Sequence, residues 1–531
     1  MNPSSHAPSA TPGVALAAPH LDAVDAARRI AAEGGTAIDA AVAAAAVLTV
    51  VYPHMCSAGG DLIALVRTPD GVETCVNSSG AYGSAQPVEE LFEAIATMPV
   101  SGPLTVSVPG VVAGWAELLE RWGALSAAQV LAPAIALARD GMVVSPGLAK
   151  ALQVDREGLA ADPGMRAMFF EGDRPVAAGA LVRQPALAAT LEALARDGLR
   201  SYYTGEVAQT LARGFAELGV PVTEADLAAH TVQLEEPIGL SVDGLHVSTA
   251  GPNSQGYTML RTLGAASVLS PEGITRLDAA VLAELFHSGD VLRDAELADP
   301  LVVDVDVEGA LSPEGLAMAA ERAVTSARTG ERAVSPVTPR PGGDTVAVTA
   351  IADDGTAISL IQSVFHSFGS LLLEPATGLV LHNRAAFFTL QEGAPNRVAA
   401  GKRPAHTLLP VIVRDAEGTV AAHGTMGGKA QSQIHTQLVL RVLEGADPAT
   451  AVSAPRFIVG GLDKGTTNDY VMVEADLDEE TRSELERGRL RIVAGSMHDS
   501  DAGHSMIARR AADGTLSAGA DPRSDGGVLL P

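Results

Sequence analysis

Two hydroxyl residues, Thr345 and Ser363, stand where they could form a nucleophilic pair. Alternating β-branched runs flank Asp353-Asp354-Gly355. This pattern predicts a β-hairpin whose three-residue loop ends on a glycine in the left-handed conformation. That register pairs Thr345 directly with Ser363, so their Cβ atoms would lie roughly 4.5 to 5.5 Å apart. The sequence therefore predicts two hydroxyls that meet at the first residue of the leading strand.

Thr345 also follows Gly342-Gly343-Asp344, a flexible stretch at which the chain could be cut. A cut between Asp344 and Thr345 would free the α-amine of the threonine, and such a residue supplies nucleophile and base together. The alternative is that Thr345 is an ordinary strand residue after an ordinary loop. The hairpin alone favours that alternative, and the catalytic interpretation depends on the rest of the chain.

Composition narrows the class of protein. The chain has 531 residues, of which 47% are hydrophobic and 19% charged, as is typical of soluble globular proteins. Its formal net charge of −27 argues against a nucleic-acid or anionic-membrane partner. Only Cys56 and Cys75 are present, so no disulfide framework or cysteine metal site is indicated. No apolar run reaches the ~20 residues of a membrane helix, and no signal peptide is evident, so we expect a cytoplasmic protein.

The expected elements alternate between helices and short strands. A Gly34-Gly35-Thr36 break, with Thr36 as N-cap, separates two helices that cover residues 21–51. Further helices are expected up to residue 213, and a mobile segment over residues 324–343. Strands are expected at residues 61–66, 73–77, 105–108, 379–383, 411–413 and 420–424. The last of these runs into Gly427-Gly428, where consecutive backbone N–H groups could form an oxyanion hole, although a simple turn is the plainer reading.

In this order, the motifs resemble those of the γ-glutamyltranspeptidase family of N-terminal nucleophile hydrolases. The resemblance runs from about residue 23 to residue 527. It is carried by Gly34-Gly35-Thr36-Ala37-Ile38-Asp39-Ala40-Ala41-Val42, Val108-Pro109-Gly110-Val111-Val112-Ala113-Gly114, Ala136-Leu137-Ala138-Arg139-Asp140-Gly141, Lys402-Arg403-Pro404, Gly427-Gly428, Ala454-Pro455-Arg456-Phe457 and Asp521-Pro522-Arg523-Ser524-Asp525-Gly526.

The resemblance implies an α/β, four-layer αββα sandwich that cuts itself between Asp344 and Thr345. The large-subunit segment 1–344 and the small-subunit segment 345–531 would stay intertwined as one domain. Ser363 falls on the residue that hydrogen-bonds the nucleophile, and Gly427 and Gly428 match the oxyanion-hole glycines. No metal or organic cofactor is implied, and the partner would be a small-molecule amide.

The residues that hold glutamate in typical members are not kept. The arginine, asparagine and aspartate of that pocket align with Ser79, Phe365 and Phe387. A buried charge without its partner loses several kcal/mol, enough to abolish a specificity. The resemblance therefore favours a substrate other than glutathione, and two aromatic rings suggest an apolar or aromatic acyl group.

Other residues in the same motifs could contact the substrate. Thr407 matches a serine of the substrate site, and His406 replaces the neighbouring serine. Arg384 and Lys429 lie in or beside motifs that line the site, and Lys429 is a candidate replacement contact for an anion. The alternative is that these charged side chains pair with structural carboxylates or reach solvent. Asp61, after two glycines, is expected to be a structural residue.

We therefore expect an autoprocessing amide hydrolase or acyltransferase that works through an acyl-enzyme on Thr345. One alternative is a genuine γ-glutamyltransferase with a rebuilt glutamate pocket. Another is a non-catalytic relative that keeps the fold as a binding or structural module. The sequence leaves open the acyl group, the choice between hydrolysis and transfer, and whether the two-segment unit forms a homodimer.

Overall fold

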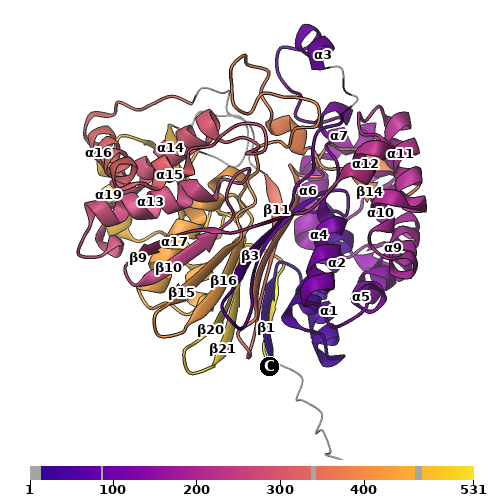
Figure 1. Ribbon diagram of the computed structural model, residues 1–531, viewed down its shortest axis with the longest axis horizontal. Coiled ribbons are helices and arrows are strands. Elements are labelled where there is room, and N and C mark those ends of the chain that lie inside the picture. Colours follow the sequence, from indigo (N-terminus) through magenta and orange to yellow (C-terminus); the bar gives the residue numbers. More distant parts are fainter. Residues whose placement is uncertain (1–12, 85, 87, 336–342, 461–468) are drawn as a thin grey trace, which may run out of the picture.

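Two β-sheets lie face to face in the computed structural model, with helices on both outer faces (Figure 1). The structure describes residues 13–84, 86, 88–335, 343–460 and 469–531. This is the four-layer αββα sandwich expected from the sequence, so the predicted fold class is confirmed. Within the described residues, no helix is both long enough and apolar enough to cross a bilayer.

The first sheet combines strands from both ends of the chain. Its strands, in spatial order, are β22 (Gly527–Leu529), β1 (Val14–Ala18), β11 (Asp344–Ala352), β12 (Ala357–Phe365), β2 (Asp61–Arg67), β3 (Glu73–Ser78) and β8 (Gln233–Glu235). The hairpin of β11 and β12 is therefore central, between β1 and β2. The second sheet consists of β21 (Leu516–Ala520), β20 (Ser505–Arg510), β16 (Val420–Thr425), β15 (Val411–Asp415), β10 (Leu245–Thr249) and β9 (Ile238–Val242).

Helices cover the first sheet on its outer side. Those nearest it are α1 (Leu21–Ala32), α2 (Ala37–Val51) and α4 (Val111–Trp122), and α5 (Ala127–Asp140) packs on α2. The others on this side of the molecule are α6 (Pro146–Val154), α7 (Arg156–Ala161), α8 (Pro163–Phe169), α9 (Pro185–Asp197), α10 (Ser201–Thr204), α11 (Glu206–Leu218) and α12 (Glu224–Ala229). A short helix, α3 (Val88–Ala94), projects at the top of Figure 1.

The second sheet has its own helical layer. It contains α13 (Gly256–Leu269), α14 (Ala279–Glu296), α15 (Val307–Leu311), α16 (Pro313–Thr329), α17 (Gln431–Leu443) and α19 (Glu479–Arg487), while α18 (Pro448–Ser453) packs on β20 and β21. A small sheet of β17 (Phe457–Val459), β18 (Tyr470–Val473) and β19 (Arg491–Ala494) lies beside it. The two-stranded pairs are β4 (Met142–Val143) with β7 (Leu181–Val182), β5 (Phe170–Glu171) with β6 (Arg174–Pro175), and β13 (Leu373–Glu374) with β14 (Leu379–Val380).

The central hairpin is apolar on both faces because each face is covered. Val346 and Val348 point to the helix-side core, whereas Ala347 and Ile351 belong to the core between the sheets. This is the two-residue alternation of a strand buried on both sides. The hairpin is consequently held by packing from two directions.

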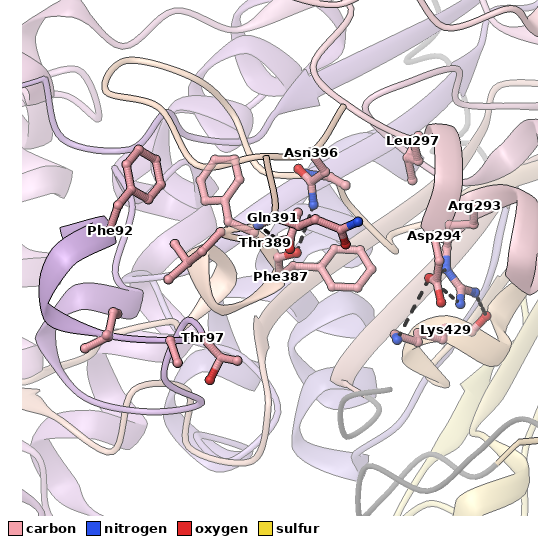
Figure 2. A pocket seen from close by; sticks show the side chains of 15 residues that line it. Phe92, Thr97, Arg293, Asp294, Leu297, Phe387, Thr389, Gln391, Asn396 and Lys429 are labelled. Atoms are coloured by element: carbon pink, nitrogen blue, oxygen red, sulfur yellow. Dashed lines mark hydrogen bonds and ion pairs between the residues drawn. The ribbon is translucent and has the colours of Figure 1, made fainter. Parts of the chain in front are cut away.

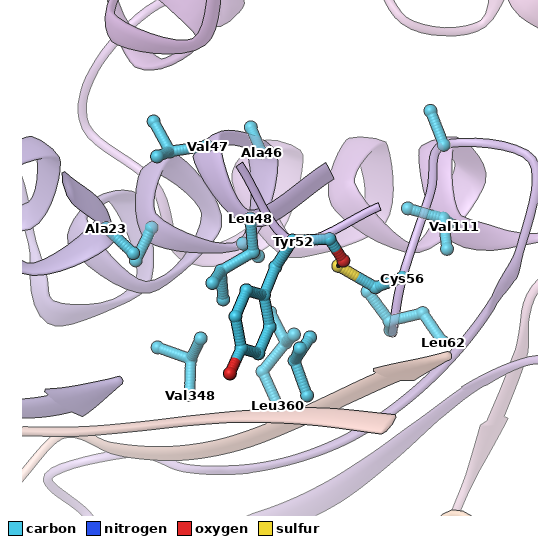
Figure 3. Close-up of a cluster of buried hydrophobic side chains, with 14 of the residues drawn as sticks. Ala23, Ala46, Val47, Leu48, Tyr52, Cys56, Leu62, Val111, Val348 and Leu360 are labelled. Atoms are coloured by element: carbon cyan, nitrogen blue, oxygen red, sulfur yellow. Dashed lines mark hydrogen bonds between the residues drawn. The ribbon is translucent and has the colours of Figure 1, made fainter. Parts of the chain in front are cut away.

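Helix α2 packs against the hairpin through small side chains. Thr36 caps it in a capping box with Asp39, as the Gly-Gly-Thr break predicts. Every residue of α2 is buried, and its last turn leads to Tyr52, whose ring lies over Val348 and Leu360 (Figure 3). These contacts fix the central strands behind the predicted nucleophile.

Several predicted boundaries were wrong. Residues 105–108 form no strand. The backbone N–H of Val108 donates to the carbonyl of Ala81, but this single hydrogen bond is not continued into a ladder. Of the expected strand 379–383, Leu379–Val380 forms β14, and Leu381 adds an isolated bridge to Gly59. The expected mobile segment begins inside α16, which continues to Thr329, and residues 336–342 of that segment lie outside the described residues.

The Val108-Pro109-Gly110 motif has a steric role. A Cβ on Gly110 would lie 1.7 Å from the carbonyl oxygen of Ser78, and one on Gly80 would lie 1.6 Å from that of Val108. Gly110 also donates its N–H to the carbonyl of Gly60, at 2.7 Å. Glycine at these positions therefore allows the backbone of this turn to pack closely against the start of β2, behind the site described below.

Candidate functional site

The hairpin has the predicted register, with one irregularity. Gly355 closes the loop at φ +93°, and Val346 pairs with Gln362 as expected. Beyond that pair a bulge shifts the register, so that Asp344 faces Phe365. Bulges turn side chains away from their regular direction. The predicted direct pairing of Thr345 with Ser363 is therefore lost from the ladder, although their hydroxyls still meet at its distorted end.

The hydroxyl of Ser363 links Thr345 to the peptide bond that precedes it. Thr345 Oγ1 donates to Ser363 Oγ at 3.3 Å, and the backbone N–H of Phe365 donates to the same oxygen at 2.8 Å. Ser363 Oγ in turn donates to the carbonyl oxygen of Asp344 at 2.5 Å. Thr345 and Ser363 are both buried. One hydroxyl thus contacts the candidate nucleophile and the carbonyl that the nucleophile would attack.

Gly427 and Gly428 lie beside the same peptide segment. They follow β16 and open a short 3₁₀ turn, Gly428–Ala430, with φ values of +152° and +50° that favour glycine. A Cβ on Gly428 would lie 2.2 Å from the backbone nitrogen of Gly343. Position 428 therefore accommodates only glycine, because its backbone lies against that of Gly343, two positions before Thr345.

The side chain of Asp344, the residue before Thr345, lines a cavity. This cavity measures about 850 Å³ and is also lined by Asp155, His366, Asp501 and His504. Burial, together with the negative charges of Asp155 and Asp501, raises the pKa of Asp344 to about 7. Asp344 can therefore carry a proton near neutral pH.

Asp61 forms a buried polar centre next to Ser363. The two residues are paired across β2 and β12. Asp61 Oδ2 lies 3.1 Å from His406 Nε2 and 3.2 Å from His382 Nδ1, and Oδ1 accepts from Gly80 N–H. Burial would raise the pKa of Asp61, but the two histidines hold it below its ordinary value. Asp61 is therefore an ionised anchor for His406, in line with the structural role expected of it.

His406 is anchored and uncharged. Burial and the nearby Arg384 lower its pKa to about 4, despite Asp61. Its Nδ1 accepts the backbone N–H of Leu408 at 3.3 Å. Both ring nitrogens therefore have protein partners, and His406 positions the loop that carries Thr407.

Arg384, Phe365 and Thr407 are in contact. The Arg384 guanidinium carbon lies 3.7 Å from the centre of the Phe365 ring, and Nη2 lies 3.4 Å from Thr407 Oγ1. Phe365 has φ +80°, a conformation that costs a non-glycine residue roughly 1–3 kcal/mol and that concentrates at functional sites. Arg384 begins the 3₁₀ turn Arg384–Phe387.

Ser79 lies at the edge of this group. Its hydroxyl donates to Asn77 Oδ1 at 2.8 Å and accepts from Asn253 Nδ2 at 3.2 Å. The backbone carbonyl of Asn253 accepts a hydrogen bond from the backbone N–H of His406 at 2.7 Å. Ser79 is thus tied to the substrate-site loop through an amide, and the position that holds arginine in typical members carries no charge here.

Phe387 and Lys429 line a second, smaller pocket (Figure 2). The pocket measures about 390 Å³, and Lys429 Nζ lies 5.4 Å from the centre of the Phe387 ring. Asp294 Oδ1 lies 4.0 Å from Nζ, so Lys429 has a carboxylate beside it. Figure 2 shows Arg293 and Asp294 on the same wall.

Sequence reasoning missed the residue that joins the two halves of the site. Gln255 Nε2 donates to the carbonyl of Thr407 at 3.0 Å and to that of Gly428 at 2.9 Å. From the sequence, Pro252-Asn253-Ser254-Gln255-Gly256 is a loop that leads into a helix and resembles a divergent branch of the family, but neither signal reveals which distant carbonyls Gln255 meets. His382 was missed for the same reason. Among the described residues, no group of three or more His, Cys, Asp or Glu side chains could hold a metal ion.

Comparisons with known proteins agree with this geometry. The family model described as Gamma-glutamyltranspeptidase matches residues 23–530. The chain is 35% identical to the oxamate amidohydrolase proenzyme of Klebsiella pneumoniae over 97% of this chain and 98% of that protein. It is 32% identical to the glutathione hydrolase-like YwrD proenzyme of Bacillus subtilis, with the same coverage.

A solved structure supports the same assignment. The cephalosporin acylase from Bacillus halodurans aligns with a TM-score of 0.86 and 28% identity, over 100% of this chain and 99% of that one. The chain therefore belongs to the gamma-glutamyltranspeptidase family, and it is an amide hydrolase of that family.

Proposed function

We propose that Thr345 is the nucleophile of an autoprocessing amidohydrolase that cuts its own chain between Asp344 and Thr345. The observation that carries the proposal is the Ser363 hydroxyl, which hydrogen-bonds both Thr345 Oγ1 and the Asp344 carbonyl oxygen. The proenzyme names of two similar proteins support the processing step. The resulting segments, 1–344 and 345–531, would each contribute strands to the first sheet.

Processing would be an acyl shift followed by hydrolysis. Thr345 Oγ1 bonds to the carbonyl carbon of Asp344, the peptide C–N bond breaks, and the hydroxyl proton passes to the departing nitrogen. Ser363, which donates to the carbonyl oxygen, stabilises the charge that develops there. Water then cleaves the ester, leaving a carboxyl on Asp344 and a free amine on Thr345.

Catalysis would reuse the same atoms. The α-amine, with an ordinary pKa of about 7.7 to 8.0, takes the hydroxyl proton as Oγ1 attacks the substrate amide. The proton leaves with the amine product, and water hydrolyses the acyl-enzyme. Gly427 and Gly428 would supply oxyanion donors, since Gly428 lies against the backbone of Gly343. An amine in place of water would give acyl transfer.

The pocket supports a substrate other than a γ-glutamyl compound. Ser79 is neutral and bonded to Asn77, and Phe365 and Phe387 present rings 5.6 Å apart between centroids. A glutamate α-amine would find no carboxylate at these three positions. The names of similar proteins, an oxamate amidohydrolase and a cephalosporin acylase, support other acyl groups.

Replacing Thr345 with alanine tests the nucleophile. We expect Thr345→Ala to remain one chain of 531 residues without amidase activity, because it lacks the attacking oxygen. Intact mass spectrometry of the purified protein measures this. Thr349→Ala, on the same strand, is the control and should be cut normally. A Thr345→Ala protein that still splits at this bond would refute the assignment.

Ser363 should set the rate of processing. We expect Ser363→Ala to slow cleavage by about 10- to 100-fold, because a donor to the reacting carbonyl is lost. The control is Ser359→Ala, since Ser359 is a buried serine of β12 that donates to the carbonyl of His423 at 2.6 Å. The readout is the uncut fraction over time after synthesis. Equal rates in the two variants would contradict the proposed role.

Asp344 should make the precursor less stable as pH rises. Its pKa is raised to about 7 in the folded chain, so folding favours the protonated carboxyl. The stabilisation is present below the unfolded pKa, near 3.9, and is lost as pH rises through about 7. In the uncut Thr345→Ala background, unfolding free energy should fall by about 2 to 3 kcal/mol more between pH 5 and pH 8 than in the same background with Asp344→Asn.

Urea denaturation at the two pH values gives both free energies. Other titrating groups are common to the two proteins, so the difference isolates Asp344. Parallel pH profiles for the two would show that this carboxyl titrates normally.

A further inference from the structure

A buried cation is connected to the candidate nucleophile, Thr345, through Phe365 and Ser363. Arg384 is 1% exposed. In the described chain, its Nη1 has no hydrogen-bond partner and its Nη2 reaches Thr407 Oγ1 at a long 3.4 Å. Burying a charge without a partner is costly, so buried arginines are normally paired. A missing anion is therefore indicated.

Three other buried arginines of the described chain lie against carboxylates. Arg293 lies 2.6 Å from Asp290, Arg456 lies 2.7 Å from Asp521, and Arg523 lies 2.9 Å from Asp521. No carboxylate of the described residues forms such a pair with Arg384. Asp61, whose charge raises the pKa of Arg384, is instead hydrogen-bonded to His406 and Gly80.

Arg384 is linked to the catalytic group from two directions. On one side, its guanidinium stacks on the ring of Phe365, whose own backbone N–H donates to Ser363 Oγ. On the other side, Thr407 is connected to Gly428 through Gln255, whose Nε2 donates to the backbone carbonyls of both residues. The cation is therefore between the residues proposed to activate the nucleophile and those proposed to hold the oxyanion.

The guanidinium stays charged at neutral pH. Burial lowers its pKa to about 9, and Asp61 opposes that shift. A guanidinium presents parallel N–H donors that match the two oxygens of a carboxylate. The rings of Phe365 and Phe387, which meet edge to face, would exclude water from such a pair.

We propose that Arg384 binds a carboxylate on the acyl group of the substrate, so that the enzyme prefers small amides with a carboxylate close to the scissile carbonyl. This inference rests on hydrolysis at Thr345, the proposed function. Phe365 contacts the Arg384 guanidinium through its ring and Ser363 through its backbone N–H. Because a single residue separates the two groups, the acyl group is limited to a few atoms. Oxamate, in which the carboxylate is bonded directly to the amide carbon, is the shortest member of this class.

Matched pairs of substrates test the preference. Oxamate, malonamate and succinamate each have a neutral diamide counterpart of the same length: oxamide, malonamide and succinamide. We expect the processed enzyme to hydrolyse one carboxylate with kcat/KM at least ~100-fold above its diamide, as charge-assisted hydrogen bonds give. Ammonia release measures the rate. Equal rates within every pair would overturn the proposal.

Variants of Arg384 separate binding from architecture. Arg384→Met should lower kcat/KM for the preferred carboxylate by ~100-fold and for its diamide by less than ~5-fold, while Arg384→Lys should recover part of the loss. Arg397→Met is the matched control, because Arg397 also stacks on a phenylalanine, Phe92, at 4.0 Å. Equal losses for both substrates in Arg384→Met would mean that Arg384 only supports the fold.

A binding measurement keeps the inference distinguishable from the proposed function. Calorimetric titration of the processed protein with oxalate, malonate and succinate needs no turnover. We expect saturable binding of one of them, weakened at least ~30-fold in Arg384→Met and unchanged in Arg397→Met. The absence of saturable binding, or equal binding in Arg384→Met, would overturn the carboxylate site. Cleavage of Thr345→Ala would instead overturn the nucleophile and leave this result standing.

Discussion

The hydrogen bonds of Ser363 at the bulged end of β11 and β12 are the interaction on which the site depends. One oxygen accepts from Thr345 Oγ1 and from the N–H of Phe365, and donates to the carbonyl of Asp344. This arrangement needs a local distortion of the ladder and a rigid surrounding. Packing supplies the rigidity, since the hairpin is central in its sheet and covered by α2 on one face and the second sheet on the other.

The same constraint explains why small residues recur around the site. Gly60 lies against the carbonyl of Ser363, where a Cβ would approach to 2.3 Å, and Gly428 lies against Gly343. Backbones that pass this close fix the positions of Ser363 and Gly343, which lie on either side of Thr345 in the hairpin. Side-chain amides then connect these backbones, as Gln255 does between Thr407 and Gly428. The positions of the polar groups thus follow from close packing of main chains.

Local patterns in the sequence predicted the layers and the hairpin well. The loop glycine, the alternation of Val346 to Ile351 and the N-cap at Thr36 are short-range signals, and each was confirmed. The predicted strand at residues 105–108 was wrong because its backbone finds one partner where a ladder needs several. The anchoring of His406 by Asp61 could not be predicted, since those residues are 345 positions apart and meet only through the fold.

The central claim is that the acyl group of a substrate is carried by Thr345. Peptide mass spectrometry after acid quench of a reacting sample tests it most directly. The account predicts a small chain that begins at Thr345 and an acyl adduct on that first residue during turnover. An adduct on any other residue, or an active enzyme whose chain remains joined between Asp344 and Thr345, would contradict it.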